Sequence, residues 1–213
     1  MNTSLRAILK SGLLLGLIAL LGTLLLATVN KLTHDRIIEQ EERRVLRQLN
    51  EIVVASAYNN DLHKDVLEIN DAAFSRQPVT VYRARMDGHD VALIMRVIAA
   101  DGYNGNIHLL VGIDTDGTLL GVRVTSHRET PGLGDPIELR KSDWVLDFTG
   151  KRLDRPGTDG WAVKKNGGDF DQFTGATISP RAVVKAVHQT LQYFESHQQT
   201  LFAEATDRAL END

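Results

Sequence analysis

The fold is decided by residues 79-VTVYRARMDGHDVALIMRVIAADGYNGNIHLLVGIDTDGTLLGVRVTSH-127. This segment contains four runs rich in apolar and β-branched residues, at 79–86, 91–100, 107–114 and 118–127. Asp87-Gly88, the loop Gly102–Asn106 and Asp116-Gly117 separate the runs. Runs of this length joined by such turns are typical of neighbouring antiparallel strands. We therefore predict an antiparallel meander.

Helices are expected to cover this sheet. A short helix is predicted around Ser142–Phe148, ended by Gly150, and a long one from Pro180 to about Phe194. Ser179 suits the N-cap position before Pro180. The long helix also carries an apolar stripe at helical spacing, formed by Val183, Val184 and Val187. The domain is thus predicted to be of the α+β class.

An apolar run precedes the domain. Residues 11–30, SGLLLGLIALLGTLLLATVN, carry no charge, and about 20 such residues span a hydrocarbon layer of roughly 30 Å as a helix. A cleaved signal peptide is the alternative, but its apolar part is usually roughly 7–15 residues long and ends in a small-x-small site. We predict a single transmembrane helix at 11–30 after a short cytoplasmic segment, 1–10. Basic residues lie on both sides of it, so charge alone does not favour an outward domain.

The residues after the span are predicted to continue the helix. Apolar residues between Ile38 and Val53 recur on one face, and Glu and Arg occupy the other. We therefore predict a helix over residues 31–55, within a stalk that covers 31–58. The stalk either packs one stripe on its own domain, which covers 59–213, or makes a coiled contact with a neighbouring membrane subunit. No pattern in 56–78 or in the tail after about 195 indicates a function.

Composition excludes several classes of function. The 213 residues include no cysteine, which excludes iron–sulfur, c-type haem and thiolate zinc sites as well as disulfides. The seven histidines form no metal-binding motif, so we predict neither a metal site nor catalytic residues. Basic and acidic residues number 24 and 28, without a basic cluster in the soluble part, which argues against nucleic acid as a partner. Redox chemistry would need an organic cofactor.

Two irregular loops are the candidate site. In 127-HRETPGLGDPIE-138, two glycines and two prolines indicate a wound backbone that a ligand can approach, or else a plain connection. In 164-KKNGGDFDQFTGATISPR-181, glycines and basic residues precede the positive end of a helix dipole, which suits a phosphate. A polar turn is the alternative there. Neither loop contains the phosphate-binding motif GxxxxGK[ST] or the dinucleotide motif GxGxxG.

The second loop carries a resemblance to a known family. Asp171-x-x-Thr174-Gly175-Ala176-Thr177 resembles the D-x-x-[ST]-G-A-[ST] motif of FMN-binding domains, in which a flavin transferase attaches FMN by a phosphoester to the last hydroxyl residue. Together with HRETPGLGD, the YNGNIHLLVGID block and the N-terminal span, it makes the chain similar to the RnfG family, the G subunits of Rnf electron-transport complexes, along nearly its whole length. The chain is more distantly similar to the C subunit of the sodium-pumping NADH:quinone oxidoreductase.

The resemblance implies roles for particular residues. Thr177 would carry covalent FMN, beside Thr174, Gly175 and Ala176, and Asp171 would belong to the signal that the transferase recognises. In the first loop the residues expected to line the isoalloxazine are Glu129, Thr130, Leu133 and Gly134, with Lys165 as a polar contact from the second loop. Residues 59–213 would then be an FMN-binding domain.

The resemblance also implies a function and a location. The chain would relay electrons as a membrane-anchored flavoprotein subunit of a complex that couples ferredoxin and NAD electron transfer to ion translocation, rather than act as an enzyme alone. Its partners would be other membrane and redox subunits, the flavin transferase during maturation, and membrane lipid. It would cross the bacterial inner membrane once, with its domain in the periplasm. A membrane-anchored binding or scaffold module without cofactor is the alternative, and the sensory part of a membrane regulator is a third hypothesis.

Overall fold

The computed structural model describes residues 3–203. Residues 1–2 and 204–213, the ends of the predicted N-terminal segment and of the predicted domain, lie outside this range. The chain divides into two compact units, residues 1–45 and 46–213, and each is described by itself.

The first unit consists of most of helix α1, which runs from Thr3 to Asn50. Its segment Gly12–Lys31 is 20 residues long and apolar enough to cross a membrane. Polar side chains inside this segment bond to their own helix, because the hydroxyls of Thr23 and Thr28 donate to the carbonyls of Ala19 and Leu24 at 2.9 and 2.8 Å. Hydroxyls satisfied in this way are compatible with a lipid environment.

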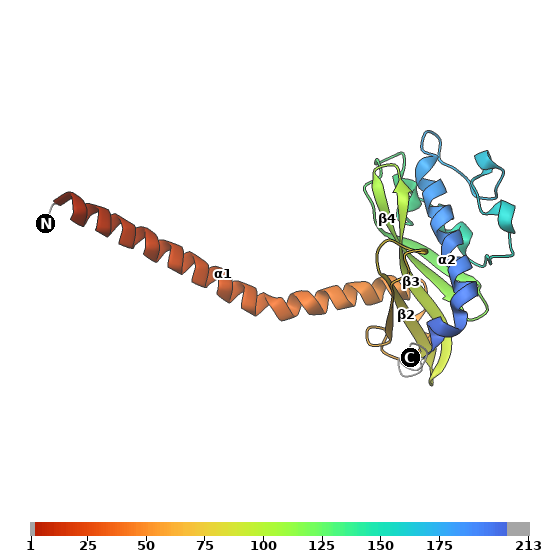
Figure 1. Ribbon diagram of the computed structural model, residues 1–213, viewed down its shortest axis with the longest axis horizontal. Coiled ribbons are helices and arrows are strands. Elements are labelled where there is room, and N and C mark those ends of the chain that lie inside the picture. Colours follow the sequence, from red (N-terminus) through yellow and green to blue (C-terminus); the bar gives the residue numbers. More distant parts are fainter. Residues whose placement is uncertain (1–2, 204–213) are drawn as a thin grey trace. The chain divides into compact units, whose positions relative to one another are not determined.

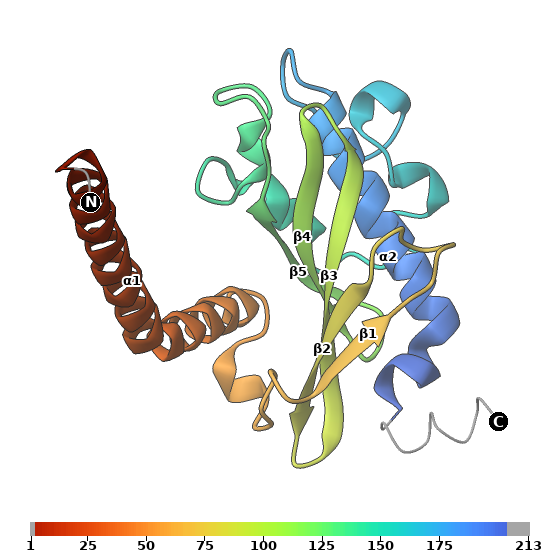
Figure 2. The same cartoon turned by 60° about the vertical axis from the view of Figure 1, so that its left-hand side comes forward.

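The second unit contains a five-stranded antiparallel sheet in the order β1-β2-β3-β4-β5 (Figures 1 and 2). Its strands are β1 (Val66–Ile69), β2 (Val79–Met86), β3 (His89–Gly102), β4 (Gly105–Asp114) and β5 (Leu119–Ser126). The predicted meander is therefore confirmed. The hairpin between β3 and β4 is tighter than the predicted loop, since Gly102 pairs directly with Gly105.

Strand β1 was not predicted. It lies in the segment 56–78, where the sequence shows no pattern, and it pairs with the first half of β2, Val66 with Tyr82 and Ile69 with Val79. A strand of four residues is too short to show a clear alternation, so the pairing partner decides its conformation.

Helix α2 (Ile178–Phe202) lies along one face of the sheet (Figure 1). It is longer than predicted at both ends, and its buried side includes the expected Val183, Val184 and Val187. The short helix is present as the 3-10 segment η3 (Asp143–Phe148), whose N-cap residue Ser142 accepts a hydrogen bond from the Trp144 N–H at 3.2 Å. The other 3-10 segments of the described chain are η1 (Ala55–Ala57), η2 (Asp135–Ile137), η4 (Thr158–Gly160) and η5 (Lys164–Asn166).

The other face of the sheet is covered by the residues that follow α1. The helix ends at Asn50, before the predicted residue 55, and the chain turns so that Ile52 and Val53 become buried. Gly112 of β4 pairs with Gly121 of β5, and the Cγ2 atom of Ile52 lies where a side chain on Gly112 would be. The chain thus leaves the helix where Ile52 packs against the glycine pair of the sheet.

Candidate functional site

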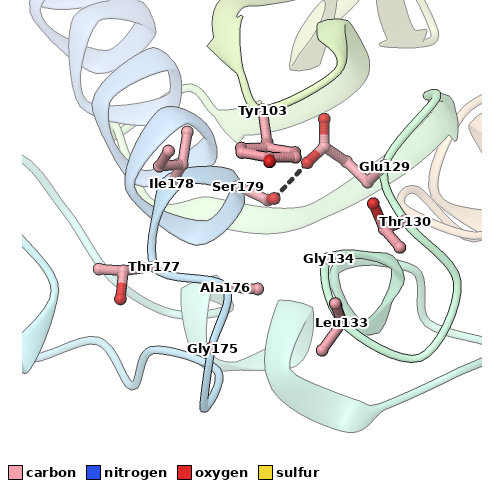
Figure 3. Close-up of a pocket in the computed structure, with 10 residues that line it drawn as sticks. All are labelled: Tyr103, Glu129, Thr130, Leu133, Gly134, Gly175, Ala176, Thr177, Ile178 and Ser179. Atoms are coloured by element: carbon pink, nitrogen blue, oxygen red, sulfur yellow. Dashed lines mark hydrogen bonds between the residues drawn. The ribbon is translucent and has the colours of Figure 1, made fainter.

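Three segments that are distant in the sequence enclose a cavity of about 210 Å³ (Figure 3). They are the tip of the β3–β4 hairpin, the loop 127–138 after β5, and the turn that leads into α2. The lining residues are Tyr103, Glu129, Thr130, Leu133, Gly134, Gly175, Ala176, Thr177, Ile178 and Ser179. The two loops that the sequence singles out therefore meet in space.

The loop 127–138 is wound tightly by its own backbone. The N–H groups of Leu133 and Gly134 both donate to the Thr130 carbonyl, at 3.1 and 3.0 Å. The Gly132 N–H donates to the Asp135 carboxylate at 2.6 Å, with φ of +76° at Gly132, a conformation that favours glycine. Gly134 is required for a different reason, because a Cβ there would lie 2.8 Å from Ser179 Oγ.

A histidine and a glutamate join the two ends of this loop. His127 Nε2 lies 2.6 Å from Glu138 Oε1, and His127 Nδ1 accepts the Glu129 N–H at 2.9 Å. Because Nδ1 is an acceptor, the neutral ring carries its proton on Nε2 and donates it to Glu138. Partial burial would raise the pKa of Glu138, but hydrogen bonds from His127 and Arg140 outweigh it and hold that pKa below its ordinary value.

Glu129 lies on the inner side of the cavity and is only 4% exposed. Its Oε1 atom accepts the Asn104 N–H at 3.0 Å, and its Oε2 atom accepts a short hydrogen bond from the Ser179 hydroxyl (Figure 3). One carboxylate thus connects the hairpin tip, the loop 127–138 and the start of α2.

The position of Ser179 corrects the prediction from sequence. Helix α2 begins at Ile178 with Thr177 as its N-cap residue, and Ser179 is buried inside the first turn. Its hydroxyl is used by Glu129 rather than by the helix end. The local pattern Ser-Pro fits an N-cap, but the tertiary contact with a carboxylate fifty residues away decides the side chain's partner.

The turn before α2 presents Thr177. Gly175 has a φ of +80°, and the Ala176 N–H donates to the Phe173 carbonyl at 3.1 Å, which closes a tight turn. Within residues 3–203, the Thr177 hydroxyl has no hydrogen-bond partner and does not cap the helix. In Figure 3 its side chain points away from Glu129 and Tyr103.

Three of the residues singled out in the second loop do not line the cavity. Thr174, Lys165 and Asp171 are all exposed. The Asp171 carboxylate forms an ion pair with Lys164 at 2.6 Å, and this hydrogen-bonded partner raises the pKa of Lys164. The Lys165 N–H donates to the Gln172 side chain at 3.1 Å. The structure thus separates an inner group around the cavity from an outer group beside it.

Besides Ser179, sequence reasoning missed two residues that line the cavity. Tyr103 at the hairpin tip and Ile178 at the start of α2 are 66% and 42% exposed. Leu133 is 47% exposed, so three large, solvent-exposed apolar side chains line the same cavity. Exposed apolar clusters of this kind mark binding sites. The signal in the sequence is an aromatic residue in a turn that would otherwise be polar.

The described part of the chain offers no group of three or more His, Cys, Asp or Glu side chains that could hold a metal ion. The cavity lining offers the Glu129 carboxylate, the hydroxyls of Thr130, Thr177 and Ser179, and apolar walls.

Two family models match the chain. Residues 102–192, which include both loops, match the family described as FMN-binding domain, and residues 1–52 match the family described as RnfG N-terminal region.

Individual proteins match over most of the chain. The G subunit of the ion-translocating oxidoreductase complex of Shewanella loihica is 50% identical over 198 residues, covering 92% of this chain and 93% of that protein. Proteins described in the same words from Shewanella piezotolerans and Vibrio cholerae are each 46% identical, covering 98% and 92% of this chain and 99% and 95% of their own lengths. A solved structure, that of the C subunit of the Na(+)-translocating NADH-quinone reductase from Parabacteroides distasonis, is 24% identical with a TM-score of 0.42, covering 68% of this chain and 69% of that one.

Proposed function

Because this chain belongs to the family of G subunits of ion-translocating oxidoreductase complexes, we propose that it is a membrane-anchored flavoprotein subunit that relays electrons through FMN bound covalently to Thr177. The observation that carries this proposal is the cavity beside Thr177, which gathers residues of both loops inside the segment that matches the FMN-binding domain. When bound, the flavin would supply the electron-transfer chemistry, and the protein would supply its position and environment.

The residues of the cavity fit a flavin. Tyr103, Leu133 and Ile178 offer apolar surfaces to a flat aromatic ring, and Glu129 and Ser179 offer polar atoms on the inner side. A cavity of about 210 Å³ is smaller than the roughly 300–1,000 Å³ typical of enclosed ligand sites. It would therefore enclose part of the ring and leave an edge exposed, which would let another redox carrier approach the ring closely.

The surroundings of Thr177 fit a phosphoester. The hydroxyl stands at the N-terminus of a helix of 25 residues, where the helix dipole favours an anion. Attachment would break the O–H bond of Thr177, form a bond from that oxygen to the phosphorus of FMN, and break the bond from that phosphorus to its leaving group on the flavin donor. A threonine hydroxyl is not acidic, so the transferase must accept its proton.

The outer group suits recognition by the transferase. Asp171 is exposed and lies on the same loop as Thr177, outside the cavity, so an enzyme could bind it without entering the site. We assign Asp171 to this recognition and Thr174 to the acceptor turn. Lys165 is exposed on the same loop, and we assign it to a polar contact with the flavin.

The helix α1 supports a place in the membrane. Its apolar segment Gly12–Lys31 would anchor the chain in the bacterial inner membrane, with lipid around it and with the domain on the periplasmic side. There the flavin would pass electrons between neighbouring redox subunits of a complex that couples ferredoxin and NAD to ion movement. Protease digestion of spheroplasts tests the orientation, and a domain that stays protected until the cells are lysed would contradict it.

Peptide mass spectrometry of the full chain, produced together with a flavin transferase, tests the attachment. The expected result is an FMN adduct on Thr177, visible also as a fluorescent band in a denaturing gel. Thr177→Ala should abolish the adduct, whereas Thr177→Ser, which keeps a hydroxyl at the same place, should retain it. A fluorescent Thr177→Ala chain would show that the flavin is attached elsewhere. An unmodified wild-type chain despite excess transferase and flavin donor would favour a scaffold without cofactor.

A further inference from the structure

The cavity contains a buried charge without a counter-ion. Glu129 is 4% exposed, and both donors to its carboxylate, the Asn104 N–H and the Ser179 hydroxyl, are neutral. Across residues 3–203, no lysine, arginine or histidine forms an ion pair with it. A buried charge is costly unless it is paired, so an unpaired one at a binding cavity indicates a role for the charge.

The rest of the cavity lining carries no charge. Among the described residues that line it, Glu129 is the only one with an ionic side chain. Tyr103, Leu133 and Ile178 form much of the remaining wall, and apolar walls screen a charge far less than water does. A ligand inside this cavity therefore experiences the negative field of one carboxylate.

Glu129 is also fixed in place. Its N–H donates to His127 Nδ1 at 2.9 Å, and its partner Ser179 is 1% exposed in the first turn of α2. Gly134 leaves the space that the pair needs, because a Cβ there would lie 2.8 Å from Ser179 Oγ and 3.0 Å from Glu129 Oε2. The carboxylate is thus held by two hydrogen-bond donors, one from the hairpin tip and one from the first turn of α2.

We propose that Glu129 lowers the reduction potential of the flavin in this cavity, as a positioned charge rather than as a group that only shapes the site. This inference rests on the proposed function. One electron from a one-electron donor adds one negative charge to the ring, unless a proton from water follows it. The fixed carboxylate opposes that added charge, so it favours electron release to the next carrier and uptake of a proton together with the electron.

The test is a potentiometric titration of the full-length flavin-bearing chain in detergent at pH 8, with an electrode and mediators supplying the electrons. Glu129→Gln removes the charge at nearly constant shape. It should raise the equilibrium constant for one-electron reduction of the flavin by about tenfold, which is a rise of about 59 mV in the reduction potential. Ser179→Ala keeps the carboxylate but removes one of its two donors, so its charge is less compensated and the potential should fall. Glu68→Gln, the same change at an exposed position of β1, should leave the potential unchanged.

Opposite shifts in the two cavity variants are the signature of a charge, since a merely structural disturbance has no reason to change sign. An unchanged potential in Glu129→Gln, or a shift of both variants in the same direction, would overturn the inference. If Glu129→Gln fails to fold or to carry flavin, the Ser179→Ala variant provides the test. A potential in that variant that does not fall below the wild-type value would overturn the proposed role of Glu129. A wild-type chain without flavin overturns the proposed function itself, which the mass of the chain reports before any titration.

Discussion

The contact of Ile52 with the glycine pair of the sheet provides a quantitative test of the fold. Ile52 is 9% exposed, and its Cγ2 atom occupies the space that a Cβ on Gly112 would need. Ile52→Ala removes the side chain beyond Cβ and leaves a cavity, so it should reduce the free energy of unfolding by about 2–4 kcal/mol. Gly112→Ala in the wild-type chain should cost about 1–3 kcal/mol, because the new methyl group overlaps Ile52.

The double variant should behave differently from the sum of the two. With Ala at position 52, the nearest atom to the new methyl group is the Cβ of residue 52 at 3.6 Å, an ordinary van der Waals contact. In the Ile52→Ala background, Gly112→Ala should therefore leave the free energy of unfolding nearly unchanged, or raise it by restoring part of the lost packing. The interaction energy of the cycle should therefore be about 1–3 kcal/mol and favour the double variant.

Denaturant unfolding of the full chain in detergent measures these values. The two tryptophans, Trp144 and Trp161, are both buried in the second unit, so their fluorescence reports on this domain. Val54→Ala is the matched control, since Val54 is 63% exposed and its truncation should change the free energy of unfolding by less than about 0.5 kcal/mol. Equal costs of Gly112→Ala in both backgrounds would refute the packing of Ile52 against the glycine pair.

Further predictions concern the two loops. Asp171→Ala should prevent flavin attachment without loss of fold, whereas Asp169→Ala on the same loop should leave attachment intact. Gel fluorescence measures the attachment. Normal labelling of the Asp171 variant by the transferase would show that Asp171 is not part of the recognition signal. Gly175→Ala should cost about 1–2 kcal/mol because φ is +80°, and an unchanged midpoint of thermal unfolding would contradict the strain. The pKa of Glu138 is lowered in the folded state, so the ionised carboxylate stabilises the fold. This stabilisation is complete above the ordinary pKa of a glutamate and is lost as the pH falls through the lowered value. Glu138→Gln should therefore make stability less sensitive to pH below about 4.5, as unfolding measured between pH 3 and 7 would show; an unchanged acid limb would count against the His127 contact.

Local patterns in the sequence were sufficient to predict most of the regular elements. The meander follows from apolar runs and turn-forming pairs, the apolar span from an uncharged stretch, and α2 from its valine stripe, because each depends on neighbours a few residues away. The same holds for the turn that presents Thr177, where Gly175 fixes the backbone conformation. Strand β1 lacks such a pattern, and it forms only because the edge of β2 is available.

Sequence patterns alone were enough to predict an apolar span, a meander covered by a helix, and a turn that ends in the hydroxyl of Thr177. Long-range packing, in contrast, brings Tyr103, Glu129 and Ser179 to one cavity and directs the Ser179 hydroxyl to a carboxylate instead of the helix end. It also places the chain after α1 on the second face of the sheet. The two kinds of feature differ in the range of the interactions that set them. Backbone conformation responds to adjacent residues, whereas the partner of a buried polar atom depends on which distant segments packing brings beside it.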